Sequence, residues 1–214
     1  MQTRLKGFVL MEVVIALCVM GVLTATIVPL SQTIIAYSRA AQTRKSFDYV
    51  MRSLTVYVAL NDRLPWPGPG GLEDEESQQP VGHVPYKTLA LEQQIAQDGH
   101  KNTLMYVVNP VLTGWIPNIH TYRTSNPFLE IEMDTAKNLR VILADGSDAI
   151  PLEESCTDFC AAVLISIPPK SEYSLNDVVQ INGDNIVVTT PPISSGVIVR
   201  WISRNNIVVL ERLR

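Results

Sequence analysis

One ionisable side chain lies inside the long apolar segment near the N-terminus. Phe8 to Leu30 is 23 residues with a single charge, that of Glu12. A carboxylate at this depth costs about 2.5 to 3.5 kcal/mol on membrane-insertion scales, so it indicates a functional group with a specific partner. Cleavage between Gly7 and Phe8 would create an ammonium group four residues before Glu12. In a bundle of such helices, the amine of one chain would neutralise the carboxylate of the next.

The element that must position Glu12 is a membrane-spanning helix. At about 1.5 Å of rise per residue, Phe8 to Leu30 forms roughly 35 Å of helix, enough to cross a hydrocarbon core of about 30 Å. Arg4 and Lys6 precede this segment and few cations follow it directly. The positive-inside rule then predicts a cytoplasmic N-terminus, with the rest of the chain in the periplasm or its equivalent.

The segment resembles the N-terminal signal of type IV prepilins and of type II secretion pseudopilins. In that family a short basic leader ends in glycine, phenylalanine follows, and glutamate is the fifth residue of the mature chain. This chain has Gly7, Phe8 and Glu12 at those places, and Gly21 and Pro29 where pilins often carry a glycine and a helix-bending proline. The resemblance implies a filament subunit. A membrane-embedded prepilin peptidase would cut after Gly7 and methylate the amine of Phe8, and Glu12 would act in filament assembly.

Two other interpretations of the segment are a secretory signal peptide and a simple membrane anchor. A signal peptide has an apolar region of about 7 to 15 residues and an Ala-x-Ala-like cleavage site. This apolar run is longer, and its nearest small-residue candidate, Thr24-Ala25-Thr26, is a poor site. A simple anchor gives no reason for Glu12, so the prepilin interpretation accounts for more of the residues.

The helix is expected to continue past the membrane. From Ser31 to Leu60 there is neither glycine nor proline, and Asn61-Asp62 followed by Pro65 ends the pattern. Pro29 should bend the helix because it lacks a backbone donor. Apolar residues recur at three- and four-residue steps, which predicts an amphipathic helix. These are Phe47, Val50, Met51, Leu54 and Val58, and the opposite face carries Arg39, Arg44, Lys45, Asp48 and Arg52.

After residue 100 the pattern changes to short runs rich in valine and isoleucine, which are typical of strands. Asn182-Gly183-Asp184-Asn185 indicates a tight hairpin, and Arg204-Asn205-Asn206 indicates another. The sequence thus predicts an α+β fold in which one long helix packs on a mostly antiparallel sheet. The candidate strands are Leu104–Asn109, Leu139–Ala144, Ala162–Ile167, Asp177–Ile181, Asn185–Thr190, Val197–Ser203 and Ile207–Leu210.

The expected organisation has four parts. Residues 1–7 form the leader, 8–30 the transmembrane half of the helix, 31–60 its amphipathic half, and 61–214 the extracytoplasmic β domain. The formal net charge is −4, and loss of the two cations of the leader would bring it to −6. This acidic balance argues against nucleic acid as a partner.

A proline- and glycine-rich stretch, Arg63 to Gly71, predicts a fixed extended loop without regular structure. The acidic run Glu73-Asp74-Glu75-Glu76 follows, and we interpret it as a solvated loop, with a cation site as the alternative. The stretch, together with Val81 to Leu91, resembles a pseudopilin-like subset with Arg-Leu-Pro-Cys-Pro and Thr-Leu-Gly-Leu motifs, which favours a minor subunit. Trp66 replaces the cysteine and Ala90 the glycine, so no disulfide is inferred at this loop.

Cys156 and Cys160 lie on the oxidising side of the membrane, which makes a local disulfide plausible. Free thiols and a metal site remain open, although the three-residue spacing is not that of thioredoxin-like or zinc-ribbon pairs. Cys18, within the apolar segment, is interpreted as a small apolar residue.

No catalytic constellation stands out. His83, His100 and His120 are scattered, and neither His-Glu-x-x-His nor Gly-x-Ser-x-Gly occurs. Asp145-Gly146-Ser147-Asp148 is either a plain turn or a calcium site of the kind found in some secretion pseudopilins, but its spacing is not that of an EF-hand. We expect neither an enzyme nor a resident cofactor.

The two resemblances imply a structural minor pseudopilin of a type II secretion filament. The alternatives are a minor pilin of a type IV pilus and a membrane-anchored envelope binding protein that never polymerises. The expected partners are prepilin peptidase, other pilin or pseudopilin subunits and an inner-membrane assembly platform. The sequence does not separate secretion from pilus, since both share the signal.

Overall fold

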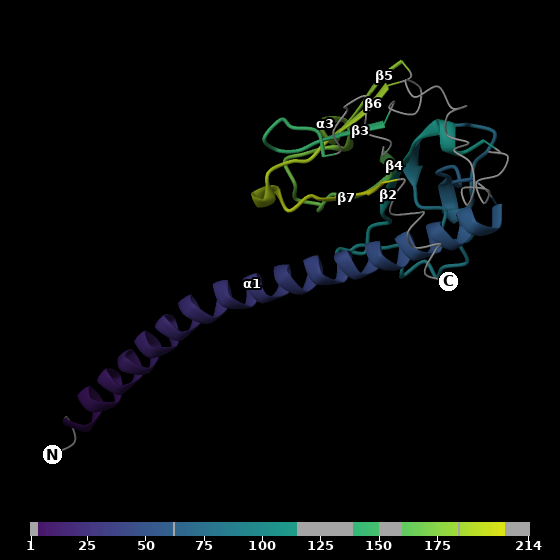
Figure 1. Cartoon of the computed structure of the whole chain (residues 1–214). Coiled ribbons are helices and arrows are strands. Elements are labelled where there is room, and N and C mark those ends of the chain that lie inside the picture. Colours follow the sequence, from purple (N-terminus) through teal and green to yellow (C-terminus); the bar gives the residue numbers. More distant parts are fainter. Residues whose placement is uncertain (1–3, 62, 115–138, 150–159, 184, 204–214) are drawn as a thin grey trace. The chain divides into compact units, whose positions relative to one another are not determined.

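The computed structural model describes residues 4–61, 63–114, 139–149, 160–183 and 185–203, with only the backbone described for residues 4–10 (Figure 1). The chain divides into two compact units, Met1–Ala41 and Gln42–Arg214. Helix α1, Arg4–Asn61, forms the described part of the first unit and continues into the second. Each unit is treated by itself below.

Helix α1 confirms the expected long helix but begins at Arg4 rather than at Phe8. A single glycine inside a helix costs only about 1 kcal/mol, so Gly7 does not delay its start. The helix also continues unbroken through Pro29. A bend at Pro29 stays a prediction. The other end matches expectation, because α1 ends at Asn61, shortly before Pro65.

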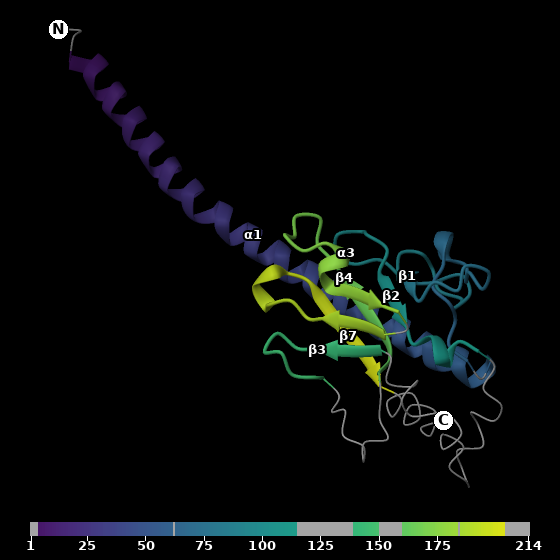
Figure 2. The same ribbon diagram turned by 90° about the horizontal axis from the view of Figure 1, so that it is seen from above.

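The described part of the second unit contains two sheets (Figures 1 and 2). The first is antiparallel, with order β1-β2-β4-β7. The second has order β3-β6-β5, in which β5 and β6 are antiparallel and β3 and β6 are parallel. The α+β prediction with a mostly antiparallel sheet is confirmed. The bounds are β1 Val81–His83, β2 Met105–Val108, β3 Leu139–Ile142, β4 Cys160–Ser166, β5 Val179–Asn182, β6 Asn185–Thr189 and β7 Ile198–Ser203.

The core of the second unit has three layers: α1, the four-stranded sheet and the three-stranded sheet. Strand alternation separates two apolar clusters, since successive side chains of a strand point to opposite faces. One cluster joins α1 to the first sheet through Phe47, Leu54, Tyr106 and Leu164, among others. The other joins the two sheets. It includes Val107, Val163, Ile165, Leu139, Val141, Ile186 and Val188.

Strand β4 lies in the middle of this arrangement, and every one of its residues is buried. It pairs with β2 on one side and with β7 on the other. Both of its faces are covered, which explains its continuous run of apolar and small residues. The periodicity prediction for α1 is confirmed by Phe47, Val50, Leu54 and Val58, all of which are buried in the first cluster.

The predicted strands that fall within the described residues are present, with ends shifted by at most two residues. For one of them, the predicted start at Asp177 was wrong. Leu175–Val178 forms a short helix, α3, before β5 begins at Val179. Asp177 therefore does not start a strand. Its carboxylate accepts hydrogen bonds from the backbone and hydroxyl of Ser174, forming a capping box. Strand β1 was not predicted. The hairpin at 182–185 is confirmed by the β5–β6 pairing, while Ile207–Leu210 and Arg204-Asn205-Asn206 lie outside the described residues.

Regular structure also interrupts the proline- and glycine-rich loop, contrary to the prediction. Pro69–Gly71 forms one 3-10 turn, η1, in which Gly70 has φ +64°. Proline sets the backbone angle that starts the turn, and glycine adopts the positive φ without steric cost. Among the described residues, η2 Pro110–Leu112 after β2 and η5 Ile193–Ser195 after β6 are also 3-10 turns.

Candidate functional site

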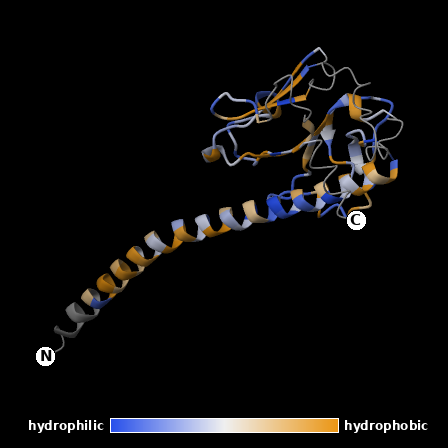
Figure 3. Cartoon of the chain, in the orientation of Figure 1, coloured by the Kyte–Doolittle hydropathy of each residue, from blue (hydrophilic) through white to orange (hydrophobic). Residues whose placement is uncertain are grey.

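The N-terminal part of α1 carries apolar side chains on all sides. Every residue from Met11 to Leu30 is exposed, and Figure 3 shows the corresponding run of hydrophobic colour. Within the part of the chain that the structure describes, α1 is the one helix long and apolar enough to cross a membrane. A helix that is apolar all round is stable only in apolar surroundings. These properties suit a membrane anchor.

The hydroxyl groups in this segment are satisfied inside the helix. Thr24 Oγ1 donates to the carbonyl oxygens of Met20 and Gly21, and Thr26 Oγ1 to those of Val22 and Leu23. Nearer its end, Ser31 Oγ donates to Val28 O and Thr33 Oγ1 to Pro29 O. Polar groups bonded to their own helix carry a reduced cost in lipid.

Glu12 is the exception among the polar groups of this segment. Its side chain is exposed on the helix surface. No hydrogen bond or ion pair involves it within the residues described here. Gly7 and Phe8 lie in the same helix, five and four residues before Glu12, but only their backbone is described. Its pairing with the amine of a neighbouring subunit stays a prediction.

The cysteine pair is described at one end only. Cys160 is buried as the first residue of β4, and its carbonyl accepts a hydrogen bond from Asn109 Nδ2 at 3.4 Å. Cys156 lies outside the described residues. The predicted disulfide therefore stays a prediction.

The Asp145–Asp148 segment forms a turn, and both of its carboxylates accept hydrogen bonds from described residues. Asp145 Oδ1 accepts hydrogen bonds from Ser147 N and Oγ, which lowers the pKa of this carboxyl. Asp148 accepts two hydrogen bonds from Arg140 Nη2 at 2.9 and 3.1 Å. Gly146 adopts φ +86°, the positive φ that the turn needs. No group of three or more metal-ligating side chains occurs among the described residues.

A polar cluster that the sequence did not predict lies at the end of α1. The carboxylate of Glu73 accepts a hydrogen bond from the hydroxyl of Tyr57 and forms an ion pair with Arg63. It also accepts a bond from the backbone nitrogen of Trp66 at 3.2 Å. The Glu73 side chain is only 10% exposed. The interpretation of the whole acidic run as a solvated loop was therefore wrong for this residue.

Burial, and after it the charge of the cluster, raises the pKa of the two tyrosines beside it. Burial, together with the hydrogen bond to Glu73 and the charge of that carboxylate, raises the pKa of Tyr57 to about 12. Tyr106 lies deeper in the core, where burial and the nearby Glu73 and Tyr57 raise its pKa well above the usual value. The guanidinium of Arg63 lies 5.7 Å from the centre of the Tyr57 ring and also contacts Glu75 at 2.6 Å.

The loop that carries Glu73 is fixed by close backbone packing. A side chain at Gly71 would place its Cβ 2.3 Å from the ring of Tyr86, and Gly71 has φ +83°. The carbonyl of Gly71 accepts a hydrogen bond from Lys87 N at 2.7 Å, and Glu73 N donates to Thr88 Oγ1 at 3.0 Å. Residues 63–73 are thus held against α1 and against the segment 86–88.

A second buried carboxylate, Asp98, was also missed. It accepts hydrogen bonds from His100 N and Asn102 N, and from Ser166 Oγ at the end of β4. The adjacent Gly99 N donates to Thr43 Oγ1 of α1 at 2.9 Å. This loop therefore joins the first turns of α1 in the second unit to the four-stranded sheet.

A scan against protein-family models and searches of curated proteins and of solved structures find no match to this chain.

Proposed function

We propose that this chain is a structural minor subunit, a pseudopilin, of a type II secretion filament. Prepilin peptidase would cut after Gly7 and methylate Phe8. The helix would then hold the subunit in the inner membrane until an assembly platform moves it into a filament. The N-terminus would face the cytoplasm, and the second unit would lie in the periplasm.

The observation that carries this proposal is Glu12. It is the one charge in an apolar segment that is exposed on all sides. A lone carboxylate there is costly unless association supplies a partner. Cleavage would give Phe8 a free ammonium group. This group would lie about one helical turn from Glu12 of its own chain, and the carboxylate of a neighbouring chain could pair with it. The low dielectric of the membrane strengthens such a pair.

Pairing between chains also explains why the charge would be useful. Only one axial stagger of two parallel helices brings the amine of one chain to the carboxylate of the next. The apolar faces alone would accept many staggers, because their packing is less directional. Glu12 would therefore fix the register of assembly, and the second unit would be displayed on the filament surface. This role requires no catalytic group and no cofactor.

The two alternative functions remain distinguishable. A minor pilin of a type IV pilus would share the cleavage, the methylation and the role of Glu12, and would differ in its partner subunits. An envelope binding protein that uses α1 only as an anchor would keep Met1, or would lack the methyl group on the amine of Phe8. The Glu12 carboxylate favours either filament protein over a plain anchor.

The experiment is to determine the N-terminus in cells with an active prepilin peptidase. Mass spectrometry should find N-methylated Phe8 in the wild type, whereas Gly7→Val should leave the full precursor because a branched side chain hinders the scissile bond. Gly21→Val serves as the matched control, since no described atom lies within 4 Å of a Cβ at Gly21. Retention of Met1 in the wild type would refute the proposal.

A further inference from the structure

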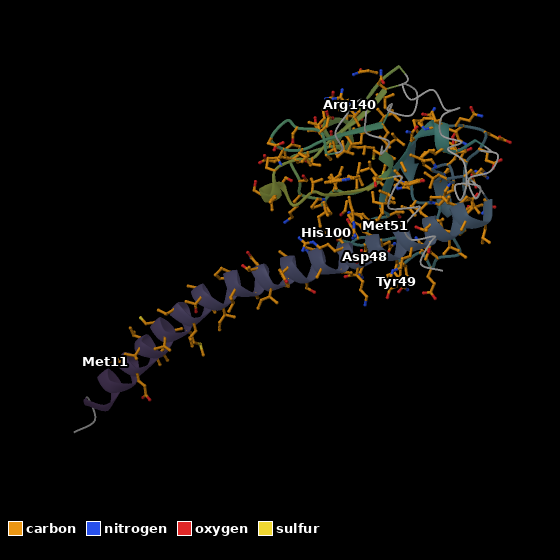
Figure 4. The ribbon with its side chains drawn as sticks, viewed as in Figure 1. Met11, Asp48, Tyr49, Met51, His100 and Arg140 are labelled. Atoms are coloured by element: carbon orange, nitrogen blue, oxygen red, sulfur yellow. The ribbon has the colours of Figure 1, made fainter. Side chains whose placement is uncertain are left out.

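One face of α1 in the second unit has no partner among the described residues. The buried side of the helix faces the first sheet, and the opposite side carries Lys45, Tyr49, Arg52 and Val56, at three- and four-residue steps. Tyr49 is 43% exposed and Val56 38%, and Figure 4 shows Tyr49 directed away from the sheets. We call these four residues, with the neighbouring Arg44, the basic helix face.

The cations of this face are not neutralised locally. Within the described residues, Arg44, Lys45 and Arg52 form no ion pair. The one acidic residue of the same stretch, Asp48, is already paired with Arg200 of β7. The face therefore combines net positive charge with an exposed aromatic and an exposed aliphatic side chain. Tyrosine and arginine, which it carries, are enriched at protein interfaces.

The same unit carries a surface of the opposite charge. Leu72, Asp74, Glu75 and Glu76, which we call the acidic ridge, follow the glycines of the fixed loop. Leu72 is 57% exposed and the Glu75 side chain 64%. Arg63 offsets part of the charge through Glu73 and Glu75, and Lys87 lies beside Gly71, but these two cations are fewer than the four acids of the run.

The acidic ridge is also held in place before any partner arrives. Gly71 packs on Tyr86, Glu73 is held by Arg63 and Tyr57, and Ser77 N donates to Asp74 Oδ1 at 3.1 Å. A surface that is already ordered loses little conformational entropy when it binds.

We propose that the basic helix face binds the acidic ridge of a second copy of this chain. The charges are complementary, whereas a symmetric pairing of either surface with itself would bring like charges together. In a filament each copy would use one of the two surfaces toward each of two neighbours. Such heterologous contacts build open, head-to-tail assemblies when the rotation between copies does not close a ring. This inference rests on the proposed filament function. It identifies the two surfaces through which the second units of neighbouring subunits would make contact.

The test uses the full chain in cells with the assembly machinery. One copy, with its own epitope tag, carries the photo-crosslinker p-benzoylphenylalanine in place of Tyr49, and a second copy carries another tag. The acidic ridge falls within one tryptic peptide, residues 64–87, because no lysine or arginine occurs between Arg63 and Lys87. We expect crosslinks between the two copies that map to this peptide. The crosslinker in place of Ile181, exposed on β5, is the control and should not reach it.

Charge reversal then tests the pairing itself. Arg52→Glu in the crosslinking copy should lower the yield at least about fivefold, the effect of roughly 1 kcal/mol. Glu76→Arg in the other copy should restore it, since the second reversal again places opposite charges across the contact. A loss without restoration would overturn the proposal.

A crosslinker in place of Leu17, within the apolar segment, separates this proposal from the filament proposal. Crosslinks from position 17 to other subunits, without any from position 49 to peptide 64–87 of a second copy, would overturn the contact alone. If position 17 also forms no crosslink and Met1 is retained, the filament proposal is refuted and this inference with it.

Discussion

The hydroxyl of Tyr57 donates a hydrogen bond to Glu73 Oε2 at 3.0 Å, and so connects the last turns of α1 to the loop that follows it. The two residues are 16 positions apart, and Arg63 lies between them in sequence and binds the same carboxylate. The chain therefore turns back after Asn61 and is fixed to the helix it has just left. This connection determines where the acidic ridge is presented.

Glu73→Gln should destabilise the second unit. The amide keeps the size of the side chain, but it removes the charge that Arg63 needs at a site where both groups are largely buried. Loss of a charged hydrogen-bond partner costs about 2 kcal/mol of the free energy of unfolding. The measurement is urea unfolding of the full chain in mild detergent, followed by tryptophan fluorescence.

Glu76→Gln is the matched control for that variant, since Glu76 lies three residues further along the same run and is exposed. Exposed substitutions of this kind usually stay within about 0.5 kcal/mol. Equal effects of the two variants would contradict the assigned role of Glu73.

Tyr57 should ionise later than an ordinary tyrosine. Its pKa in the folded protein is about 12, against 10.0 for an ordinary tyrosine. The unfolded chain releases this proton first as pH rises, so the folded state is favoured fully below pH 10 and loses that advantage as pH approaches 12. Phenolate absorbance of the wild type minus that of Tyr57→Phe gives the titration of this group.

The comparison with Glu73→Gln isolates the cause of that shift. This variant removes the neighbouring negative charge and leaves only a neutral amide oxygen to accept from the Tyr57 hydroxyl, so the pKa of Tyr57 should move down toward its ordinary value. An unchanged titration would show that burial alone sets it.

Gly71→Ala should destabilise the loop more than Gly146→Ala does. Both glycines have positive φ, +83° and +86°, so both variants lose about 1 to 2 kcal/mol from backbone strain. Only Gly71 faces a close neighbour, the ring of Tyr86, whereas nothing lies within 4 Å of a Cβ at Gly146. The added clash should cost about 1 to 3 kcal/mol more. Thermal unfolding of both variants, side by side, measures the difference.

Glu12→Ala should be inserted and cleaved like the wild type but should fail to join the filament. Neither insertion nor cleavage depends on the charge pair, and the loss of a carboxylate makes insertion easier. Glu12→Gln should behave in the same way, because the pair needs the charge rather than the size. The comparison is between inner-membrane levels and crosslinking to partner subunits. Incorporation equal to that of the wild type would show that Glu12 does not direct assembly.

Local patterns in the sequence determined the helix, the apolar segment and most of the strands. The spacing of Phe47, Val50, Leu54 and Val58 places them on one helical face whatever lies against it, and all four are buried. The hairpin at residues 182–185 follows from the backbone angles that Asn-Gly favours. Both features depend on residues close together in the sequence, so they could be predicted from the sequence alone.

Only the tertiary structure decided which carboxylates are buried. Glu73 and Glu76 belong to the same acidic run, yet one is enclosed by Arg63, Tyr57 and Trp66 and the other is exposed. Asp98 depends on Ser166, 68 positions away. The parallel pairing of β3 with β6 likewise joins distant segments. Such contacts depend on the path of the whole chain, because a charge is tolerated in the interior only where folding brings its partners to it.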